Sequence, residues 1–130
     1  MHCARLAIDT DIFADSFDQK TYSISELSIE VEYQNNLKTK FNWNDQFKIG
    51  MSKTICVKAE TSFGNVTNVF LKHNQRSSLG LKVKFIQIQK SPGSEVYTSW
   101  VLGSNNEKSF WITNKTCETD TWCQLTDSGI

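Results

Sequence analysis

Four aspartates lie close together near the start of the chain, with two phenylalanines between them. The acidic residues are Asp9, Asp11, Asp15 and Asp18, and the aromatic residues are Phe13 and Phe17. Carboxylates clustered in one loop suit Ca²⁺, a hard cation that takes about six to eight oxygen ligands. Their spacing fits no EF-hand, and a solvated acidic loop is the alternative interpretation. The two phenylalanines beside such a loop would be placed to enter a lipid interface.

The chain has four cysteines, an even number that allows complete pairing in disulfides. Cys117 and Cys123 are separated by a short polar segment, which predicts a local disulfide between them and leaves Cys3 to pair with Cys56. Zinc ligation and free buried thiols are the alternatives, but no two cysteines have the CxxC spacing common in zinc sites. Disulfides indicate an oxidising compartment, so we expect a secreted or cell-surface protein.

Two sequences for N-linked glycosylation, at Asn65 and Asn114, agree with that compartment. The first residues lack the charged and then apolar pattern of a signal peptide. We therefore expect residues 1–130 to form a single domain of a larger extracellular or surface protein.

Four tryptophans are a high number for this length. Trp43 and Trp100 are in phase with the apolar residues of predicted strands, which places them in the core. Trp111 is out of phase with its apolar neighbours, and Trp122 lies between the two paired cysteines, so we expect both to be exposed. An exposed tryptophan is a typical anchor for a protein partner or a membrane interface.

Three lysines, Lys82, Lys84 and Lys90, alternate with other residues along one predicted strand. We expect them to line one face of that strand. Such a row is either a solvated surface or a source of weak attraction to anionic partners, including anionic lipids.

No residue pattern indicates catalysis. The sequence contains no GxSxG elbow, no HExxH pair and no phosphate-binding glycine loop. Of the two histidines, His2 lies at a terminus that we expect to fray, and His73 lies at a predicted strand end, as a solvated or hydrogen-bonded loop residue. We therefore predict no enzymatic activity.

The composition is that of an ordinary globular domain. Of 130 residues, 38% are hydrophobic and one is proline, which excludes a disordered or collagen-like chain. Fourteen Lys plus Arg balance fourteen Asp plus Glu. Because the net charge is zero, no overall field favours nucleic acid as a partner.

Apolar residues recur at every second position through most of the chain, which predicts β-strands and no helix. The clearest strand has Leu27, Ile29, Val31 and Tyr33 on one face and polar residues on the other. Between Phe85 and Ile86 the apolar phase changes, which indicates a β-bulge or a strand that passes from one sheet to another. Residues 91–94, Ser-Pro-Gly-Ser, are the strongest turn signal, and we expect Val96, Thr98, Trp100 and Leu102 to form the strand after it.

About eight short strands separated by turn residues are typical of a sandwich. We therefore predict an all-β fold, a two-sheet antiparallel β-sandwich.

The segment 64–88 resembles the second half of a PLAT domain, the lipoxygenase-homology sandwich. The resemblance is in the strand that ends in Lys72-His-Asn74, the loop Ser77-Ser-Leu-Gly80 and the strand over 81–88. Residues 5–10 are similar to the first strand of the family. Leu81 stands where the family usually has Trp or Phe after the loop glycine.

The resemblance implies a non-catalytic binding module that targets its parent protein to a membrane, a lipid interface or a protein partner, with calcium as a cofactor. The alternative is a protein-interaction or adhesion sandwich of another family, with no lipid role. Fold alone does not choose between these two classes, because each uses a surface added to the same framework.

Overall fold

The computed structural model describes residues 1–8, 22–24, 26–43, 45–47, 50–76, 80–103, 109–118 and 121–128. The strands are β1 (His2–Ile8), β2 (Tyr22–Ile24), β3 (Leu27–Tyr33), β4 (Lys38–Asn42), β5 (Asp45–Phe47), β6 (Ser52–Val57), β7 (Val66–His73), β8 (Leu81–Gln89), β9 (Tyr97–Val101), β10 (Phe110–Ile112) and β11 (Cys123–Asp127). One 3₁₀ turn, η2 (Thr61–Phe63), precedes β7. In this part of the chain no helix is long and apolar enough to cross a membrane.

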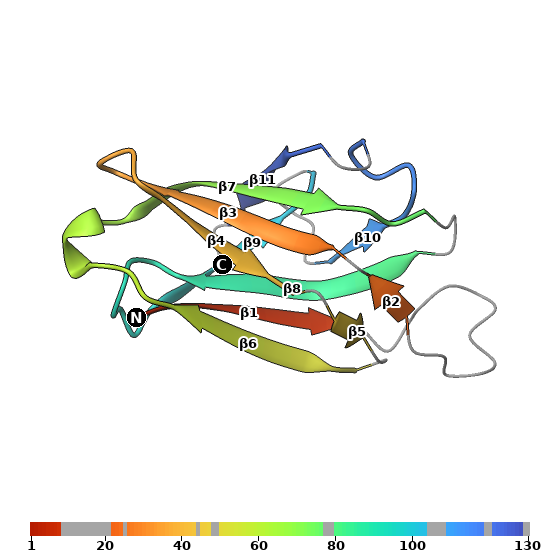
Figure 1. Ribbon diagram of the computed structural model, residues 1–130, viewed down its shortest axis with the longest axis horizontal. Helices are drawn as coiled ribbons and strands as arrows, with labels where there is room; N and C mark the ends of the chain where they lie inside the picture. The colour runs from red at the N-terminus through yellow and green to blue at the C-terminus, as the bar shows by residue number, and fades with distance from the viewer. Residues whose placement is uncertain are drawn as a thin grey trace.

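The strands form two layers that share one strand. One layer has the order β4-β3-β7-β11, and the other has β9-β8-β1-β6 with β10 also beside β8, all antiparallel (Figure 1). The residues Cys123 to Leu125 of β11 pair with β7, and Thr126 and Asp127 pair with β9. β11 therefore passes from one layer to the other, and the predicted all-β sandwich is confirmed.

The alternation of side chains along each strand explains the core. In β3, Leu27, Ile29, Val31 and Tyr33 are buried at 1% exposure or less. Successive side chains of a strand point to opposite faces, so Glu30 and Glu32 lie on the outer face of the layer. Trp43 and Trp100 are buried as predicted.

The phase change in β8 marks a β-bulge, as predicted. Ala7 of β1 pairs with Phe85, but the next residue, Ile8, pairs with Val83, so the register skips Lys84. At the same place the other neighbour of β8 changes from β10, which pairs with residues 81–83, to β9, which pairs with residues 86–89.

The turn at Pro92 is also confirmed, and it corrects the start of the strand that follows. Ser94 N–H donates to the Ser91 carbonyl at 3.1 Å, and Gly93 has φ +78°. Proline before a glycine of positive φ is typical of a type II turn. We expected Val96 in the following strand, but β9 begins at Tyr97 and Val96 is 57% exposed. The reason is local, because the Val96 N–H donates to the Ser94 hydroxyl at 3.0 Å within the turn.

Both predicted disulfides are present. Cys3 and Cys56 face each other across β1 and β6, with their Cα atoms 4.0 Å apart, and their bond ties β6, at one end of the strand order, to its neighbour. Cys117 and Cys123 close the segment that connects β10 to β11.

Candidate functional site

A tryptophan and two lysines from three different elements meet on the outer face of the β4-β3-β7-β11 layer. The ammonium of Lys40, on β4, lies 5.4 Å from the centre of the Trp122 ring, and that of Lys72, on β7, lies 5.7 Å from it. Both distances are within the range of cation–π attraction. We call Trp122, Lys40 and Lys72 the Trp122 cluster.

The alternation of the strands places these side chains outside. Phe41 and Leu71, the neighbours of Lys40 and Lys72 in sequence, are fully buried, so both lysines point outward. Cys123 packs against the core and is held by its disulfide, which leaves Trp122 on the outer side, in the disulfide loop just before β11. The cluster therefore rests on two strands and on a covalently closed loop.

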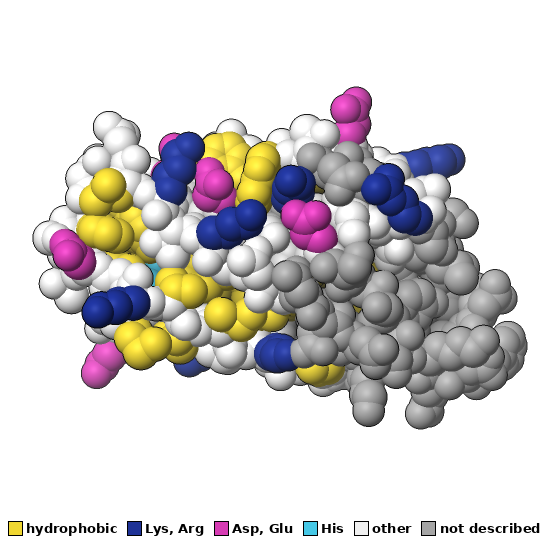
Figure 2. Space-filling view, in the orientation of Figure 1, with side chains coloured by type: hydrophobic (Ala, Val, Ile, Leu, Met, Phe, Trp, Pro, Cys, Tyr) yellow, Lys and Arg dark blue, Asp and Glu magenta, His cyan; other side chains and the backbone are white. Residues whose placement is uncertain are grey.

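Glutamates balance the lysines of this face. Lys72 Nζ lies 3.7 Å from Glu26 Oε1, while Lys38 Nζ lies 3.5 Å from Glu30 Oε1 and 3.7 Å from Glu32 Oε2. Figure 2 shows basic and acidic side chains intermixed over this layer. Because the two signs alternate at short range, the face offers local cations rather than a broad positive field.

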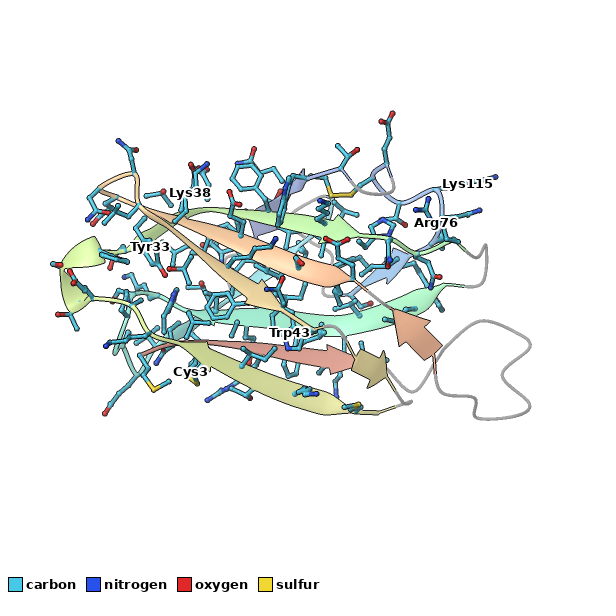
Figure 3. All side chains as sticks on the ribbon, in the orientation of Figure 1. Cys3, Tyr33, Lys38, Trp43, Arg76 and Lys115 are labelled. Atoms are coloured by element: carbon cyan, nitrogen blue, oxygen red, sulfur yellow. A yellow bond between two sulfur atoms is a disulfide. The ribbon has the colours of Figure 1, made fainter. Side chains whose placement is uncertain are left out.

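Further cations lie where this layer ends. Figure 3 shows Arg76 and Lys115 at the same end of the molecule, on the segments that follow β7 and β10. Both side chains are exposed. This end thus adds positive charge beside the face that carries the Trp122 cluster.

Trp111 forms a separate pair on the other layer. It faces Lys82 across β10 and β8, and the Lys82 ammonium lies 5.7 Å from the centre of its ring. Because Phe110 and Ile112 are buried, Trp111 points outward. Trp111 and Trp122 are half-buried rather than exposed as we expected, because lysine side chains lie beside both rings.

The three lysines that we expected on one strand face are spread along β8. Lys82 is half-buried near its start, Lys84 is exposed at the bulge, and Lys90 is exposed just beyond its end. A rise of about 3.3 Å per residue separates the first from the last by roughly 26 Å. They therefore form no compact basic patch.

The six residues of the predicted calcium loop, Asp9, Asp11, Phe13, Asp15, Phe17 and Asp18, lie outside the described residues. Among the residues that are described, no group of three or more His, Cys, Asp or Glu side chains is placed to hold a metal ion. Calcium at this loop stays a prediction.

His2 is fully buried, which corrects the expectation of a frayed terminus. Its Nε2–H donates to the Gln89 carbonyl at 3.0 Å, and its Nδ1 accepts from the Tyr33 hydroxyl. Burial is the main cause that lowers the pKa of His2, and burial likewise raises the pKa of Tyr33. Both shifts favour the neutral forms, so the pair is a neutral hydrogen bond inside the core.

His73 lies at the end of β7 and is hydrogen-bonded, as one of the two expectations had it, but it is buried rather than solvated. Its Nδ1 accepts from the Gln75 N–H at 3.0 Å, and its Nε2–H donates to the Thr116 carbonyl. These two bonds require the neutral tautomer with the proton on Nε2. The ring fixes the segment after β10 against the end of β7.

The two glycosylation sequences differ in accessibility. Asn114 is exposed in the turn after β10, while Asn65 is half-buried and its N–H donates to Gln34 Oε1 at 3.2 Å. Glycosylation at both positions stays a prediction.

Sequence reasoning missed Lys40 and Lys72. A signal was present, since each lysine alternates with core residues, Phe41 in one strand and Leu71 in the other. What the sequence did not show is that β3 pairs with both strands and brings the two lysines to one ring.

Comparison with known proteins identifies the fold. No protein-family model and no curated protein matches this chain. Among solved structures it is similar to the alpha toxin from Clostridium absonum, with a TM-score of 0.57 and 11% identity over 96% of this chain. The chain spans 30% of the length of that toxin. At this identity the likeness establishes a shared β-sandwich fold.

Proposed function

We propose that this domain is a non-catalytic, PLAT-like binding module that attaches its parent protein to a membrane or lipid interface. The observation that carries the proposal is the Trp122 cluster, an indole ring with two ammonium groups 5.4 and 5.7 Å from its centre, on the outer face of a sheet. Tryptophan is favoured at the depth of lipid headgroups, because its ring is apolar and its N–H is polar. Lysines beside it reach lipid phosphates while their apolar stems stay in contact with the interface.

Two further observations support a binding role without catalysis. His2 and His73 are buried and each uses both ring nitrogens in hydrogen bonds to the fold, so neither is placed as a general base on the surface. The fold is shared with part of a toxin, and the two disulfides are compatible with a secreted or cell-surface location.

The position of the two outward tryptophans predicts how the domain would dock. Trp122 lies on the outer face of one layer and Trp111 on that of the other. A flat membrane in contact with the first face cannot also lie against the second. We therefore assign binding to the Trp122 face and use Trp111 as a matched control.

The test is flotation of the folded domain with vesicles of phosphatidylcholine alone and with added phosphatidylserine, each with and without Ca²⁺. We expect the wild-type chain to float and Trp122→Ala to bind at least about tenfold more weakly, a loss of about 1.4 kcal/mol. Trp111→Ala should bind like wild type. Near-UV circular dichroism of each variant shows that the fold is kept.

Each other result has a definite meaning. Equal losses for the two variants would contradict docking through the Trp122 face. Binding that requires Ca²⁺ would support the predicted loop of Asp9, Asp11, Asp15 and Asp18. No flotation under any condition would reject the lipid proposal and favour a protein-interaction domain.

A further inference from the structure

The strands of the β9-β8-β1-β6 layer, together with β10, carry positive charge and no negative charge. Their sequences contain no Asp or Glu, and their cations are Arg5, Lys53, Lys82 and Lys84. In the other layer, Glu30 and Glu32 of β3 pair with a lysine of β4. An anion that approaches the second layer therefore meets cations without strand carboxylates beside them.

Arg5 is the best placed of these cations to bind a ligand. Its neighbours in β1, Ala4 and Leu6, are buried, so its side chain points outward, where it is exposed. The guanidinium lies over the Tyr97 ring of β9, 3.7 Å from the ring centre. Among the described residues no carboxylate pairs with it, Glu95 in the turn before β9 included. Stacking on the ring engages the flat side of the guanidinium and leaves the N–H groups at its edge for a further partner.

Neutral polar side chains surround Arg5 on the same face. Gln87 of β8 and Thr54 of β6 are its direct cross-strand partners, and Ser99 of β9 faces Gln87. Because directly opposite residues have Cβ atoms about 4.5 to 5.5 Å apart, Gln87 and Thr54 can contact the same ligand group as Arg5. In the described part of the chain these three side chains form no hydrogen bond, whereas the Gln89 amide is engaged by a backbone N–H and a backbone carbonyl. An amide and two hydroxyls are thus open to a ligand beside the guanidinium.

The β-bulge of β8 brings a second cation to this face. Val83 and Ile86 are fully buried, so the two residues between them, Lys84 and Phe85, both lie on the outer side. Lys84 is exposed and lies three residues from Gln87, which is about 10 Å along the strand. Two cations therefore follow the direction of β8, with neutral polar groups beside them.

We propose that this surface binds a linear polysaccharide that carries sulfate or carboxylate groups. We call it the Arg5 face, and its residues are Arg5, Thr54, Lys84, Gln87 and Ser99. A guanidinium binds an oxyanion through two parallel N–H groups, and amide and hydroxyl groups donate to and accept from sugar hydroxyls. Cations about 10 Å apart suit a chain on which negative groups recur, rather than one small anion.

Other polyanions fit the Arg5 face less well. Single-stranded nucleic acid binds by stacking bases on aromatic rings, but the Tyr97 ring is already covered by Arg5. A protein partner needs apolar anchors at the centre of the interface, and the surroundings of Arg5 are polar. The disulfides are compatible with a secreted or cell-surface location, where acidic polysaccharides are abundant. The Arg5 face shares no residue with the Trp122 cluster, so it is independent of the lipid proposal.

The test is calorimetric titration of the folded chain with a heparin hexasaccharide, with a dextran oligosaccharide as the uncharged control. We expect saturable binding of heparin alone, weaker in about 0.5 M NaCl because salt screens the cations. Arg5→Gln should raise the dissociation constant about tenfold. Lys38→Gln removes one cation from the other layer and should change it less than about twofold. Arg5→Lys keeps the charge but loses the paired N–H groups, so its affinity should lie between those of wild type and Arg5→Gln.

Several results would overturn the proposal. Absence of saturable heparin binding, or equal binding of dextran, would reject an acidic polysaccharide. Equal losses for Arg5→Gln and Lys38→Gln would mean that no particular face is used, and equal affinity of Arg5→Lys and wild type would reject recognition by paired N–H groups. Tighter binding of a single-stranded oligodeoxythymidine that also depends on Arg5 would identify a nucleic-acid surface instead. Flotation of Arg5→Gln with vesicles should equal that of wild type, so failure here is distinguishable from failure of the lipid proposal.

Discussion

The two outer faces of the sandwich both carry cations, but they differ in their acidic side chains although their strands alternate in the same way. The outer face of the β4-β3-β7-β11 layer carries lysines and glutamates around Trp122. The outer face of β8, β1 and β6 carries the cations Arg5, Lys82 and Lys84 among uncharged side chains, and these three strands contain no Asp or Glu. Gln87 there faces Arg5 on one side and Ser99 on the other. Alternation explains the core that both layers share, whereas the outward half of each strand decides what its face can bind.

The faces also differ in how their side chains are held. On the second face, Cys3 and Cys56 are joined covalently, and the Arg5 guanidinium lies 3.7 Å from the centre of the Tyr97 ring. On the first face, side chains meet through ion pairs near 3.5 to 3.7 Å and through lysine–indole contacts. Ion pairs near the surface contribute only about 0.2 to 1 kcal/mol each to stability, so the side chains of the first face are held less firmly than the disulfide of the second.

The largest expected effect comes from the disulfide of the second face. The double variant Cys3→Ala/Cys56→Ala lacks this bond, whose cysteines are 53 residues apart in sequence. The chain-entropy relation then predicts that the free energy of unfolding falls by about 4 kcal/mol. The double variant Cys117→Ala/Cys123→Ala opens a loop with a sequence separation of only 6, so its free energy of unfolding should fall by about 2 kcal/mol. Urea denaturation measures both, and a larger loss for the shorter loop would contradict the entropic explanation.

The next effect tests the core behind the first face. Ile29 is fully buried in β3, so Ile29→Ala should lower the free energy of unfolding by about 2 to 4 kcal/mol. Glu30→Ala, the next residue on the outer face, is the control and should change it by about 0.5 kcal/mol or less. A cost below about 0.5 kcal/mol for Ile29→Ala would disprove the assignment of faces.

Local patterns in the sequence predict most of the framework. A few adjacent residues determine each of three features: the alternation in β3, the bulge near Phe85 and the turn at Gly93. Both disulfides can also be predicted from the sequence. Cys117 and Cys123 are close together, and only Cys3 and Cys56 then remain to form the second bond.

Contacts between distant segments could not be predicted in the same way. The partners of His2 are 31 and 87 residues away, so the sequence around His2 contains no sign of its burial. Lys40 and Lys72 meet Trp122 only because β3 pairs with both of their strands. The change of partner of β11 from β7 to β9 is likewise a property of the whole topology.

The pH dependence of stability tests the buried histidine between the faces. Burial lowers the pKa of His2 in the folded state, so the unfolded chain binds a proton more readily. This contribution to stability is complete above about pH 6.5 and is lost as the pH falls from there toward the lowered pKa. His2→Gln has no titrating ring, and denaturation at pH 7.5 and 5.0 should show a smaller loss for it than for wild type. Equal losses would mean that His2 does not titrate differently on folding.

The smallest effects separate the two faces by their response to salt. Lys38→Ala removes the ion pairs with Glu30 and Glu32 and should cost about 0.2 to 1 kcal/mol at low ionic strength. Arg5→Ala removes the stacking on Tyr97 and should cost about 0.5 to 1 kcal/mol. In urea denaturation with about 1 M NaCl, where the Debye length is about 3 Å, the first cost should nearly vanish and the second should largely remain. If salt reduced both costs equally, the side chains of the two faces would be held by the same kind of contact, and the contrast between an ionic face and a stacked, covalently joined face would fail.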